Sequence, residues 1–243
     1  MVSKSEIKLI TGLHQKKYRN RHGMFIAEGI KVITELYKAG MDLRELFTVD
    51  ADLFSFTGNR AREISENELK KISQLKTPNK ALALFDIPEE KKAGNSGIVV
   101  ALDDIRDPGN LGTIVRLCDW FGVEDLVCST TTVDCFNAKV VQATMGSLAR
   151  VNIVYTDLEA YIRESGLPAF AADMDGENVY TASLPEQGIL VMGNEANGIS
   201  GNIRLLADRF VSIPRFGRVQ QTESLNVATA TAILLSEFRR GYQ

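Results

Sequence analysis

Histidine and cysteine are scarce in this sequence of 243 residues, which holds two histidines and three cysteines. With so few imidazoles, we expect no histidine-based metal centre. Cys118, Cys128 and Cys135 do not have the spacing of zinc ligands, and an odd number of thiols cannot all pair. Reduced thiols are typical of cytoplasmic proteins, so we predict a cytoplasmic protein that holds no metal.

Long apolar runs are also missing. No stretch approaches the ~20 residues that cross a bilayer, and the charged N-terminus lacks the apolar segment of a secretory signal. Two nucleotide-binding fingerprints are absent as well, since no strand is followed by G-x-G-x-x-G and no G-x-x-x-x-G-K-[S/T] occurs. We therefore expect neither a membrane partner, nor a P-loop, nor the usual dinucleotide-binding domain.

Charge is unevenly distributed along the chain. Residues 1–92 hold 17 Lys and Arg against 13 Asp and Glu, whereas residues 93–243 hold 11 against 18. The basic surplus is greatest near the N-terminus, where residues 1–31 hold seven basic and two acidic side chains. This asymmetry indicates that the N-terminal part binds a polyanion such as a nucleic acid, although a similar surplus is common in proteins that bind none.

Two stretches of alternating strands and helices are separated by a polar segment at 88–97 that is rich in helix and strand breakers. The first stretch predicts a small α/β sandwich. The second begins with a continuous apolar run at 98–102, which is typical of a strand buried on both faces, so we predict a mostly parallel sheet covered on both sides. We divide the chain into domains at 1–92 and 93–243. Besides a short helix within 1–20, helices are expected at 28–39, 64–72, 114–121, 138–149, 158–165 and 225–238, and strands at 23–27, 43–49, 81–85, 98–102, 126–128, 151–155, 169–172, 188–192 and 209–213.

The turn at 107–112 leaves the C-terminal end of a buried strand, where α/β proteins gather their ligand sites. Asn110 is positioned to cap the next helix, whose N-terminus attracts anions. Arg116 follows about a turn and a half further on. A buried or half-buried arginine there requires an anionic partner, either a structural carboxylate or a substrate phosphate. The acidic side chains near this turn favour a strand-to-helix connection over a magnesium site; they are Asp103, Asp104 and Asp107.

The last fifty-odd residues contain two short apolar strands, each followed by a loop, and then a helix. Gly193 and Gly198 allow the first loop to fold tightly. Either Ser224 or Asn226 is placed to cap the final helix. Two strand ends, two loops and a helix start predict a small-molecule pocket, although such loops also serve as ordinary strand–helix connections.

Three segments carry a family resemblance when they are taken in order. The first runs from Asp107 to Arg116 (DPGNLGTIVR) and the second from Leu190 to Ser200 (LVMGNEANGIS). The third is Ile213-Pro214 followed by SLNVATA at 224–230. Together they resemble the motifs of the SpoU–TrmH group of S-adenosylmethionine-dependent RNA ribose 2′-O-methyltransferases. The segments at 15–19 and 23–29 look like the substrate-binding domain that many members carry, which resembles RNA-binding ribosomal proteins.

This resemblance implies a deep trefoil knot in the C-terminal domain, with knotted loops that hold S-adenosylmethionine in a bent shape. It also implies a homodimer with the last helix at its interface, which agrees with the small side chains of that helix. The implied activity is methyl transfer to a ribose 2′-hydroxyl of RNA, with ribosomal RNA preferred over tRNA. The alternative is a catalytically silent RNA-binding or ribosome-assembly protein, which the intact polar motif residues argue against.

The resemblance also assigns residues. The implied catalytic residues are Asn110, Arg116, Glu195, Ser224 and Asn226. The implied cofactor-binding residues are Met192, Gly193, Asn194, Gly198, Ile213, Leu225, Asn226 and Ala228. RNA contacts are expected from the basic cluster near the N-terminus, in which the aromatic ring is available for stacking on a base; these residues are Lys16, Lys17, Tyr18, Arg19 and Arg21.

One departure from the family pattern and the permanent charge of arginine affect these expectations. Members commonly read Ile-Pro-Met with a short link to Ser-Leu-Asn, whereas here Arg215 replaces the Met and 216–223 lengthen the link. Arg215 and Arg218 belong either to an RNA contact or to a solvated loop. Because arginine keeps its proton at neutral pH, we expect Arg116 to hold the RNA phosphate beside the 2′-hydroxyl, and Glu195 to hold either Arg116 or Asn110.

Overall fold

The computed structural model describes residues 1–217 and 224–241, and two compact units emerge from its contacts. The first consists of Met1–Glu89 together with Asp134–Arg150, and the second of Glu90–Val133 together with Val151–Gln243. The break after Glu89 falls within the predicted linker. The assignment of 134–150 to the first unit differs from the contiguous division expected from sequence. Within the described residues, none of the helices has both the length and the apolar character that a bilayer crossing requires.

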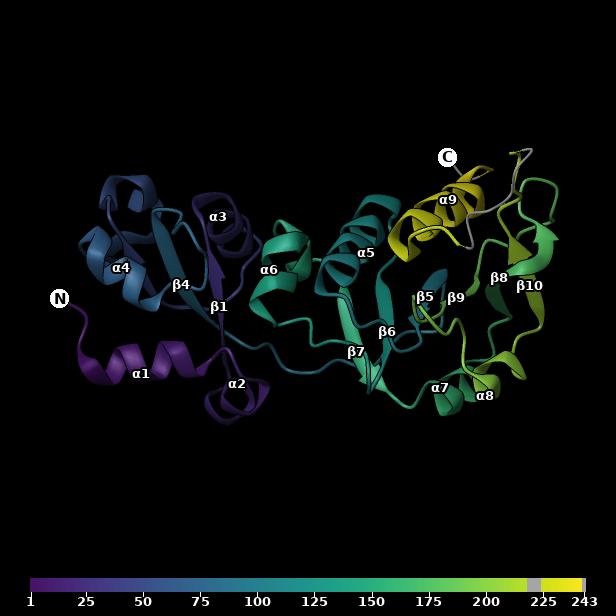
Figure 1. Cartoon of the computed structure of the whole chain (residues 1–243), viewed down its shortest axis with the longest axis horizontal. Coiled ribbons are helices and arrows are strands. Elements are labelled where there is room, and N and C mark those ends of the chain that lie inside the picture. The colour runs from purple at the N-terminus through teal and green to yellow at the C-terminus, as the bar shows by residue number, and fades with distance from the viewer. Residues whose placement is uncertain (218–223, 242–243) are drawn as a thin grey trace. The chain divides into compact units, whose positions relative to one another are not determined.

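The first unit is built on a four-stranded sheet in the order β1-β4-β2-β3, of which β1 and β4 are labelled in Figure 1. The strands are β1 (Met24–Glu28), β2 (Leu43–Thr48), β3 (Ala61–Glu63) and β4 (Ala81–Asp86). Strand β4 pairs antiparallel with β1 and β2, and β2 pairs parallel with β3. The helical elements that accompany this sheet in the first part of the chain are α1 (Lys4–Gly12), α2 (Lys16–His22), α3 (Ile30–Lys38), the 3-10 segment η1 (Ala51–Arg60) and α4 (Glu66–Ile72).

Local sequence signals fix the ends of several of these helices. A capping box starts α4, because Ser65 accepts from the backbone of Glu68 while Glu68 accepts from the backbone of Ser65. The same reciprocal pair occurs at Ser3 and Glu6 at the start of α1. Helix α2 ends at Gly23, whose φ of 64° is costly for a residue with a side chain. The basic segment at 16–22 is therefore a separate helix, not the end of α1.

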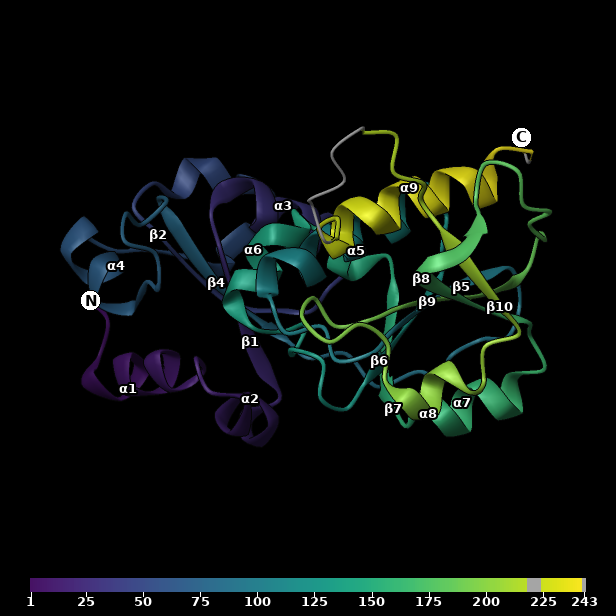
Figure 2. The same ribbon diagram turned by 45° about the vertical axis from the view of Figure 1, so that its right-hand side comes forward.

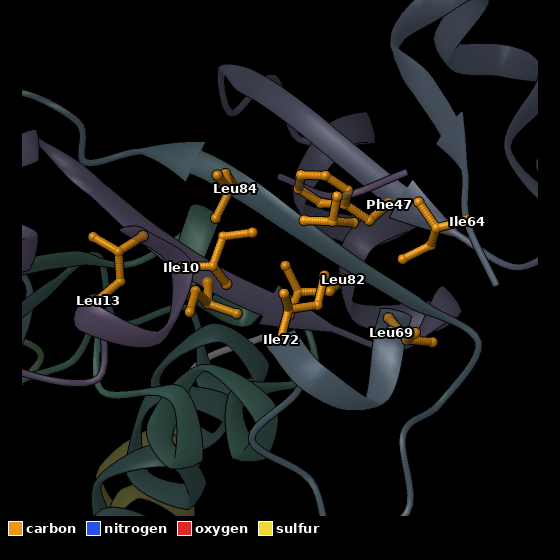
Figure 3. Close-up of a cluster of buried hydrophobic side chains, with 10 residues drawn as sticks. Ile10, Leu13, Phe47, Ile64, Leu69, Ile72, Leu82 and Leu84 are labelled. Atoms are coloured by element: carbon orange, nitrogen blue, oxygen red, sulfur yellow. The ribbon is translucent and has the colours of Figure 1, made fainter. Parts of the chain in front are cut away.

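The core of this unit consists of aliphatic and aromatic side chains from its helices and its sheet. Ile10 and Leu13 approach from α1 and its end, Phe47 and Leu82 come from the sheet, and Ile72 comes from α4 (Figure 3). All five side chains are at most 1% exposed. Burial on this scale is the main stabilising contribution for a unit of this size.

Residues 134–150 form part of the first unit through α6 (Ala138–Thr144) and the 3-10 turn η2 (Ser147–Ala149). Phe136 packs against Phe25 of β1 with ring centroids 4.9 Å apart and the rings tilted by 40°. The predicted single helix over 138–149 is interrupted, because Met145 and Gly146 adopt φ values of 52° and 100°. A Cβ at Gly146 would lie 2.4 Å from Cβ of Glu35, so the close approach to α3 requires glycine here.

The second unit contains a six-stranded sheet in the order β10-β8-β9-β5-β6-β7, and every neighbouring pair is parallel. The strands are β5 (Ile98–Leu102), β6 (Asp125–Ser129), β7 (Asn152–Thr156), β8 (Ala169–Asn178), β9 (Gly188–Met192) and β10 (Arg209–Ser212). Helices α5 (Pro108–Phe121) and α9 (Val227–Arg239) lie side by side on one face, and α7 (Leu158–Ser165) and α8 (Gly201–Arg204) cover the other (Figures 1 and 2). The predicted parallel α/β architecture is confirmed.

Strand β8 has an irregularity that places side chains at the end of the sheet. Its pairing with β10 runs from Phe170 and Ala171 directly to Glu177 and Asn178, which leaves 172–176 out of register. Gly176 closes this excursion against β10, where a Cβ would lie 2.6 Å from the backbone of Phe210. The five excluded residues follow Ala171, the last residue of β8 that pairs with β9.

Candidate functional site

The site begins at the N-terminus of α5, which follows the buried strand β5. Asp107 caps this helix and accepts a hydrogen bond from the backbone N–H of Asn110 at 2.8 Å. The prediction that Asn110 caps the helix is therefore wrong, because its side chain is directed elsewhere. Pro108 at the first helical position needs no hydrogen-bond partner for its nitrogen. The cap holds Asn110 at the start of the helix and leaves its amide free for other partners.

Asn110 forms hydrogen bonds with side chains from two distant segments of the chain. Its Nδ2 donates to Oε1 of Glu195 at 2.9 Å, and its Oδ1 accepts from Nδ2 of Asn226 at 2.8 Å. Asn226 is also the N-cap of α9, since its Oδ1 accepts from the backbone N–H groups of Ala228 and Thr229. One amide thus connects the loop after β9 to the start of the final helix. Of the two caps considered for that helix and the two partners considered for Glu195, the structure selects Asn226 and Asn110.

The loop after β9 is closed by its own backbone. Asn194 and Gly198 exchange two hydrogen bonds of 2.9 Å, and Oδ1 of Asn194 accepts from the N–H groups of Ala196 and Asn197. Gly193 packs so closely that a Cβ there would lie 2.3 Å from the carbonyl carbon of Gly198. The loop is consequently a tight turn with little room for substitution at its first residue.

The acidic residues that follow β5 serve as hydrogen-bond acceptors for this loop. Asp103 accepts from the backbone N–H of Ser200 at 2.7 Å, and the Asp104 carbonyl accepts from Nδ2 of Asn194 at 2.7 Å. Asp104 itself has a φ of 61°, a conformation that aspartate tolerates better than most residues. Among residues 1–217 and 224–241, no three acidic, histidine or cysteine side chains are grouped as metal ligands would be.

A cavity of about 1000 Å³ opens beside this loop in the second unit. Its apolar wall includes Met192, Val211, Val227 and Leu234, all of which are buried. The predicted cofactor-binding residues that line it are Met192, Gly193, Asn194, Gly198, Ile213 and Leu225, and the predicted catalytic residues Glu195 and Ser224 line it as well. Asn226 and Ala228 lie at the start of α9 and are not among its lining residues.

Some lining residues carry no signal in the three motifs. Asp173 and Met174 enter the cavity wall from the out-of-register part of β8, and Arg215 and Phe216 enter from the segment after β10. One sequence feature could have identified Asp173 and Met174. They belong to a turn-like Asp-Met-Asp-Gly sequence directly after a predicted parallel strand, and ligand sites collect at the C-terminal ends of such strands. Of the long link, 218–223, including the predicted RNA candidate Arg218, lie outside the described residues.

Arg116 lies on α5 with its side chain exposed, and within the described residues no hydrogen bond or ion pair engages its guanidinium. Of the two anionic partners considered for Arg116, a structural carboxylate is not found among the described residues. Trp120, four residues further along the same helix, is 83% exposed. This face of α5 therefore carries an exposed guanidinium group and an exposed indole ring.

The predicted RNA-contacting residues lie in the first unit on α2, where they separate into two groups. Lys16, Lys17 and Arg21 are exposed, and Nζ of Lys17 lies 5.0 Å from the ring centroid of Tyr18. Arg19 is 3% exposed and forms an ion pair with Asp134, while its Nη1 donates to the carbonyls of residues 13 and 14. The guanidinium of Arg19 is thus used inside the unit, which was not expected from sequence.

Comparisons with known proteins give a family match for each of the two parts of the chain. Residues 97–236 match the model of the SpoU rRNA Methylase family, and residues 4–83 match that of the MRM3-like substrate binding domain. The chain is 31% identical over 237 residues to the 23S rRNA (guanosine(2553)-2′-O)-methyltransferase RlmP of Bacillus subtilis (strain 168), with 93% of each chain covered.

Two solved structures share the whole fold. A TrmH-family protein from Porphyromonas gingivalis is 39% identical with a TM-score of 0.89, and 99% of each chain is covered. An AdoMet-bound rRNA methyltransferase from Sinorhizobium meliloti is 30% identical with a TM-score of 0.86, and 100% of this chain and 98% of that chain are covered. The similarity therefore includes both units.

Proposed function

The chain belongs to the SpoU rRNA methylase family, and we propose that it transfers a methyl group from S-adenosylmethionine to a ribose 2′-hydroxyl of RNA, with ribosomal RNA as the preferred substrate. The observation that carries this proposal is the meeting of all three sequence motifs at one place. Asn110, Glu195 and Asn226 are linked by hydrogen bonds, and Glu195 also lines the large cavity. A protein that kept the fold without the activity has no need for this linkage.

The cavity fits the methyl donor by size and chemistry. Its volume lies at the upper end of the range for small-molecule sites, and its buried apolar wall suits a purine ring. Gly193, Ile213 and Leu225 line this cavity, and we expect them to surround the adenosine part, with backbone groups of the tight turn at 193–198 beside it. When bound, S-adenosylmethionine supplies an electrophilic methyl group on a sulfonium.

The acceptor hydroxyl must lose its proton and be aligned with that methyl group. Arg116 cannot serve as the base, since its guanidinium stays protonated. Its exposed and unpaired state within the described chain suits a different role, in which it binds the phosphate next to the target ribose. The chain of Glu195, Asn110 and Asn226 orients polar groups at the edge of the cavity, with Ser224 beside them.

Substitution of Arg116 separates substrate positioning from donor binding. We expect Arg116→Ala to lower kcat by at least about a hundredfold, the size seen when a charge-stabilising group is removed. Binding of S-adenosylhomocysteine, measured by calorimetry, is expected to be unchanged. Loss of that binding in a folded variant would place Arg116 in the donor pocket instead.

Incorporation of labelled methyl groups tests the activity itself. Purified protein and tritiated S-adenosylmethionine should label ribosomal RNA from cells that lack the gene, and RNA from cells that retain it should be labelled far less. Mapping of 2′-O-methyl groups in the two RNAs then identifies the nucleotide. If neither ribosomal RNA nor tRNA is labelled while RNA still binds, the catalytically silent alternative is correct.

For the RNA surface we propose the exposed side chains of Lys16, Lys17 and Arg21 on α2, together with the half-buried ring of Tyr18. Basic side chains there would contact phosphates, and the ring of Tyr18 would stack on an unpaired base. Deletion of 1–92 is a poor test of this role. It would uncover the buried side chains of 134–150, which belong to the same unit. Point substitutions avoid that problem.

The proposal extends to a homodimer in the cytoplasm whose interface includes α9 and the neighbouring face of α5. Trp120 is 83% exposed, and a large exposed ring is more typical of an interface than of a solvated surface. We expect light scattering to give the mass of a dimer for the intact chain. Trp120→Ala should shift the equilibrium toward monomer without lowering the thermal stability of the monomer.

A trefoil knot in the second unit is also part of the proposal. Contacts that support it tie the loop at 193–200 to 103–104 and tie the start of α9 to the start of α5. An experimental backbone trace is expected to show the C-terminal segment threaded through a preceding loop. A trace in which α9 only rests on the surface of the unit would contradict this.

A further inference from the structure

Asp173 is a carboxylate in the wall of the large cavity, and neither the sequence motifs nor the chemistry described above gives it a role. It lies in the segment of β8 that is out of register with β10, at the C-terminal end of the sheet. Its side chain is 19% exposed. Few carboxylates are so enclosed without a partner or a ligand.

Two contacts hold Asp173 in one orientation. Its Oδ1 accepts the backbone N–H of Asp175 at 3.0 Å, and its Oδ2 accepts from Nη1 of Arg204 in an ion pair. The guanidinium of Arg204 lies in turn 4.7 Å from the ring centroid of Phe210, which fixes its plane. Burial by itself would raise the pKa of Asp173, but these hydrogen bonds outweigh it and the pKa is lowered. The group is therefore an anion, and thus only an acceptor, at neutral pH.

The contacts leave acceptor capacity on both oxygens. A carboxylate offers about four lone-pair positions, two on each oxygen, and Asp175 and Arg204 each occupy one on a different oxygen. One acceptor position therefore remains on each oxygen of a carboxylate that lines the cavity. A pair of neighbouring hydroxyl groups, each with one proton to donate, matches that arrangement.

The ion pair with Arg204 also argues against a cationic ligand group. Its charge largely offsets that of Asp173, so attraction for an ammonium group is weakened, whereas hydrogen-bond acceptance from a neutral hydroxyl is retained. The neighbouring Met174 contacts a second cation, because its Sδ lies 2.8 Å from Nη2 of Arg215. This part of the wall is suited to a polar neutral group.

We propose that Asp173 binds the 2′- and 3′-hydroxyls of the ribose of the methyl donor. This inference rests on the proposed function, since it assigns the nucleoside part of the donor to the cavity. Asp173 thus raises the affinity for nucleosides with an intact ribose over those that lack a hydroxyl. Arg204 is the residue that positions Asp173.

Calorimetry with substituted protein and modified ligand tests this directly. The ligands are S-adenosylhomocysteine, its 2′-deoxy and 3′-deoxy forms, and 5′-methylthioadenosine, which keeps the ribose but lacks the amino acid. Wild-type protein should bind each deoxy form about tenfold to a hundredfold more weakly than S-adenosylhomocysteine, as loss of a hydrogen bond to a charged group predicts. Asp173→Asn and Asp173→Ala should weaken S-adenosylhomocysteine and 5′-methylthioadenosine by the same factor.

The decisive result is the combination of the two changes. In Asp173→Ala the deoxy forms and S-adenosylhomocysteine should bind equally well, because the partner of the hydroxyls is already gone. Asp175→Asn is the matched control, because it also removes one carboxylate charge, two residues from Asp173. The side chain of Asp175 is exposed and does not line the cavity, so all affinities should be unchanged. Melting curves of both Asp173 variants will test whether they are folded. If Asp173→Ala does not fold, Asp173→Asn is used instead, because asparagine has the same shape as aspartate.

Three outcomes would overturn the inference. Loss of affinity for S-adenosylhomocysteine but not for 5′-methylthioadenosine would assign Asp173 to the amino-acid end. Unchanged affinities with a lowered melting temperature would make the Asp173–Arg204 pair purely structural, and the proposed function would stand. Absence of S-adenosylhomocysteine binding in the wild-type protein would overturn the proposed function as well.

Discussion

Asn226 donates a hydrogen bond from Nδ2 to Oδ1 of Asn110 at 2.8 Å, although 116 positions separate the two in sequence. Each residue also stands at the start of a helix, and these helices, α5 and α9, lie against each other. A side chain that caps one helix thereby sets the orientation of an amide on the other. The geometry of the proposed active site depends on this pair.

Substitution of Asn226 by Asp separates its capping role from its link to Asn110. Aspartate still accepts from the N–H groups of Ala228 and Thr229, and its charge suits a helix N-terminus. It has no N–H to donate, so the bond to Asn110 is lost. We expect Asn226→Asp to unfold at a denaturant concentration close to that of the wild type, while kcat falls about tenfold or more.

Asn226→Ala is the companion to that variant. It removes both the cap and the link, and we expect it to lose about 1 kcal/mol of stability in addition to the activity. Equal kcat values for Asn226→Asp and wild type would show that only the cap matters.

Gly193 should tolerate no side chain. A methyl group there would lie 2.3 Å from the backbone of Gly198, so Gly193→Ala must displace the 193–198 turn from the cavity. We expect this variant to remain folded and to bind S-adenosylhomocysteine at least about tenfold more weakly, as measured by calorimetry. Gly201→Ala is the control, because no atom lies within 4 Å of the added methyl group. Equal losses in the two variants would show that the turn is not part of the donor site.

Arg19 and Arg21 are two residues apart on α2 and should behave in opposite ways. Arg19→Ala leaves Asp134 without its buried partner, so we expect a loss of about 3 kcal/mol in the free energy of unfolding, measured in urea. Arg21→Ala removes an exposed charge and should leave stability unchanged while RNA affinity falls and depends less on salt. If Arg21→Ala binds RNA as tightly as wild type, α2 is not the RNA surface.

Acid should weaken the first unit through Glu68. Hydrogen bonds from the backbone of Ser65 and Val2 lower its pKa from 4.5 to about 2. Because the folded pKa is the lower one, this stabilisation is complete above about pH 4.5 and is lost as the pH falls toward 2. Glu68→Gln keeps a side chain suited to the capping box but does not titrate. The difference in melting temperature between wild type and this variant should be largest at neutral pH and vanish near pH 2.

Local signals in the sequence predicted much of this fold. The strands at 98–102 and 188–192 are found with those limits, because continuous apolar runs between breakers have few alternatives. The helix expected to end at residue 121 does end there, because Gly122 follows with a φ of 64°. The motif residues Asn110, Glu195 and Asn226 were expected to share one site, and their side chains are in contact.

Features that depend on distant contacts were not predicted. The burial of Arg19 follows from Asp134, which lies 115 positions away, and a basic cluster in sequence gives no sign of it. The out-of-register part of β8 follows from its pairing with β10. The elements β3 and α8 were missed because they have too few residues to show a period. The longer η1 was missed because its backbone is not helical at Phe54 and Gly58.

The return of 134–150 to the first unit has a consequence for protein engineering. A chimera made by a single crossover near residue 90 would combine the sheet of one parent with the α6–η2 segment of the other. Gly146 and Glu35 would then come from different proteins, and so would Arg19 and Asp134. An exchange of RNA specificity between relatives should therefore transplant both pieces together.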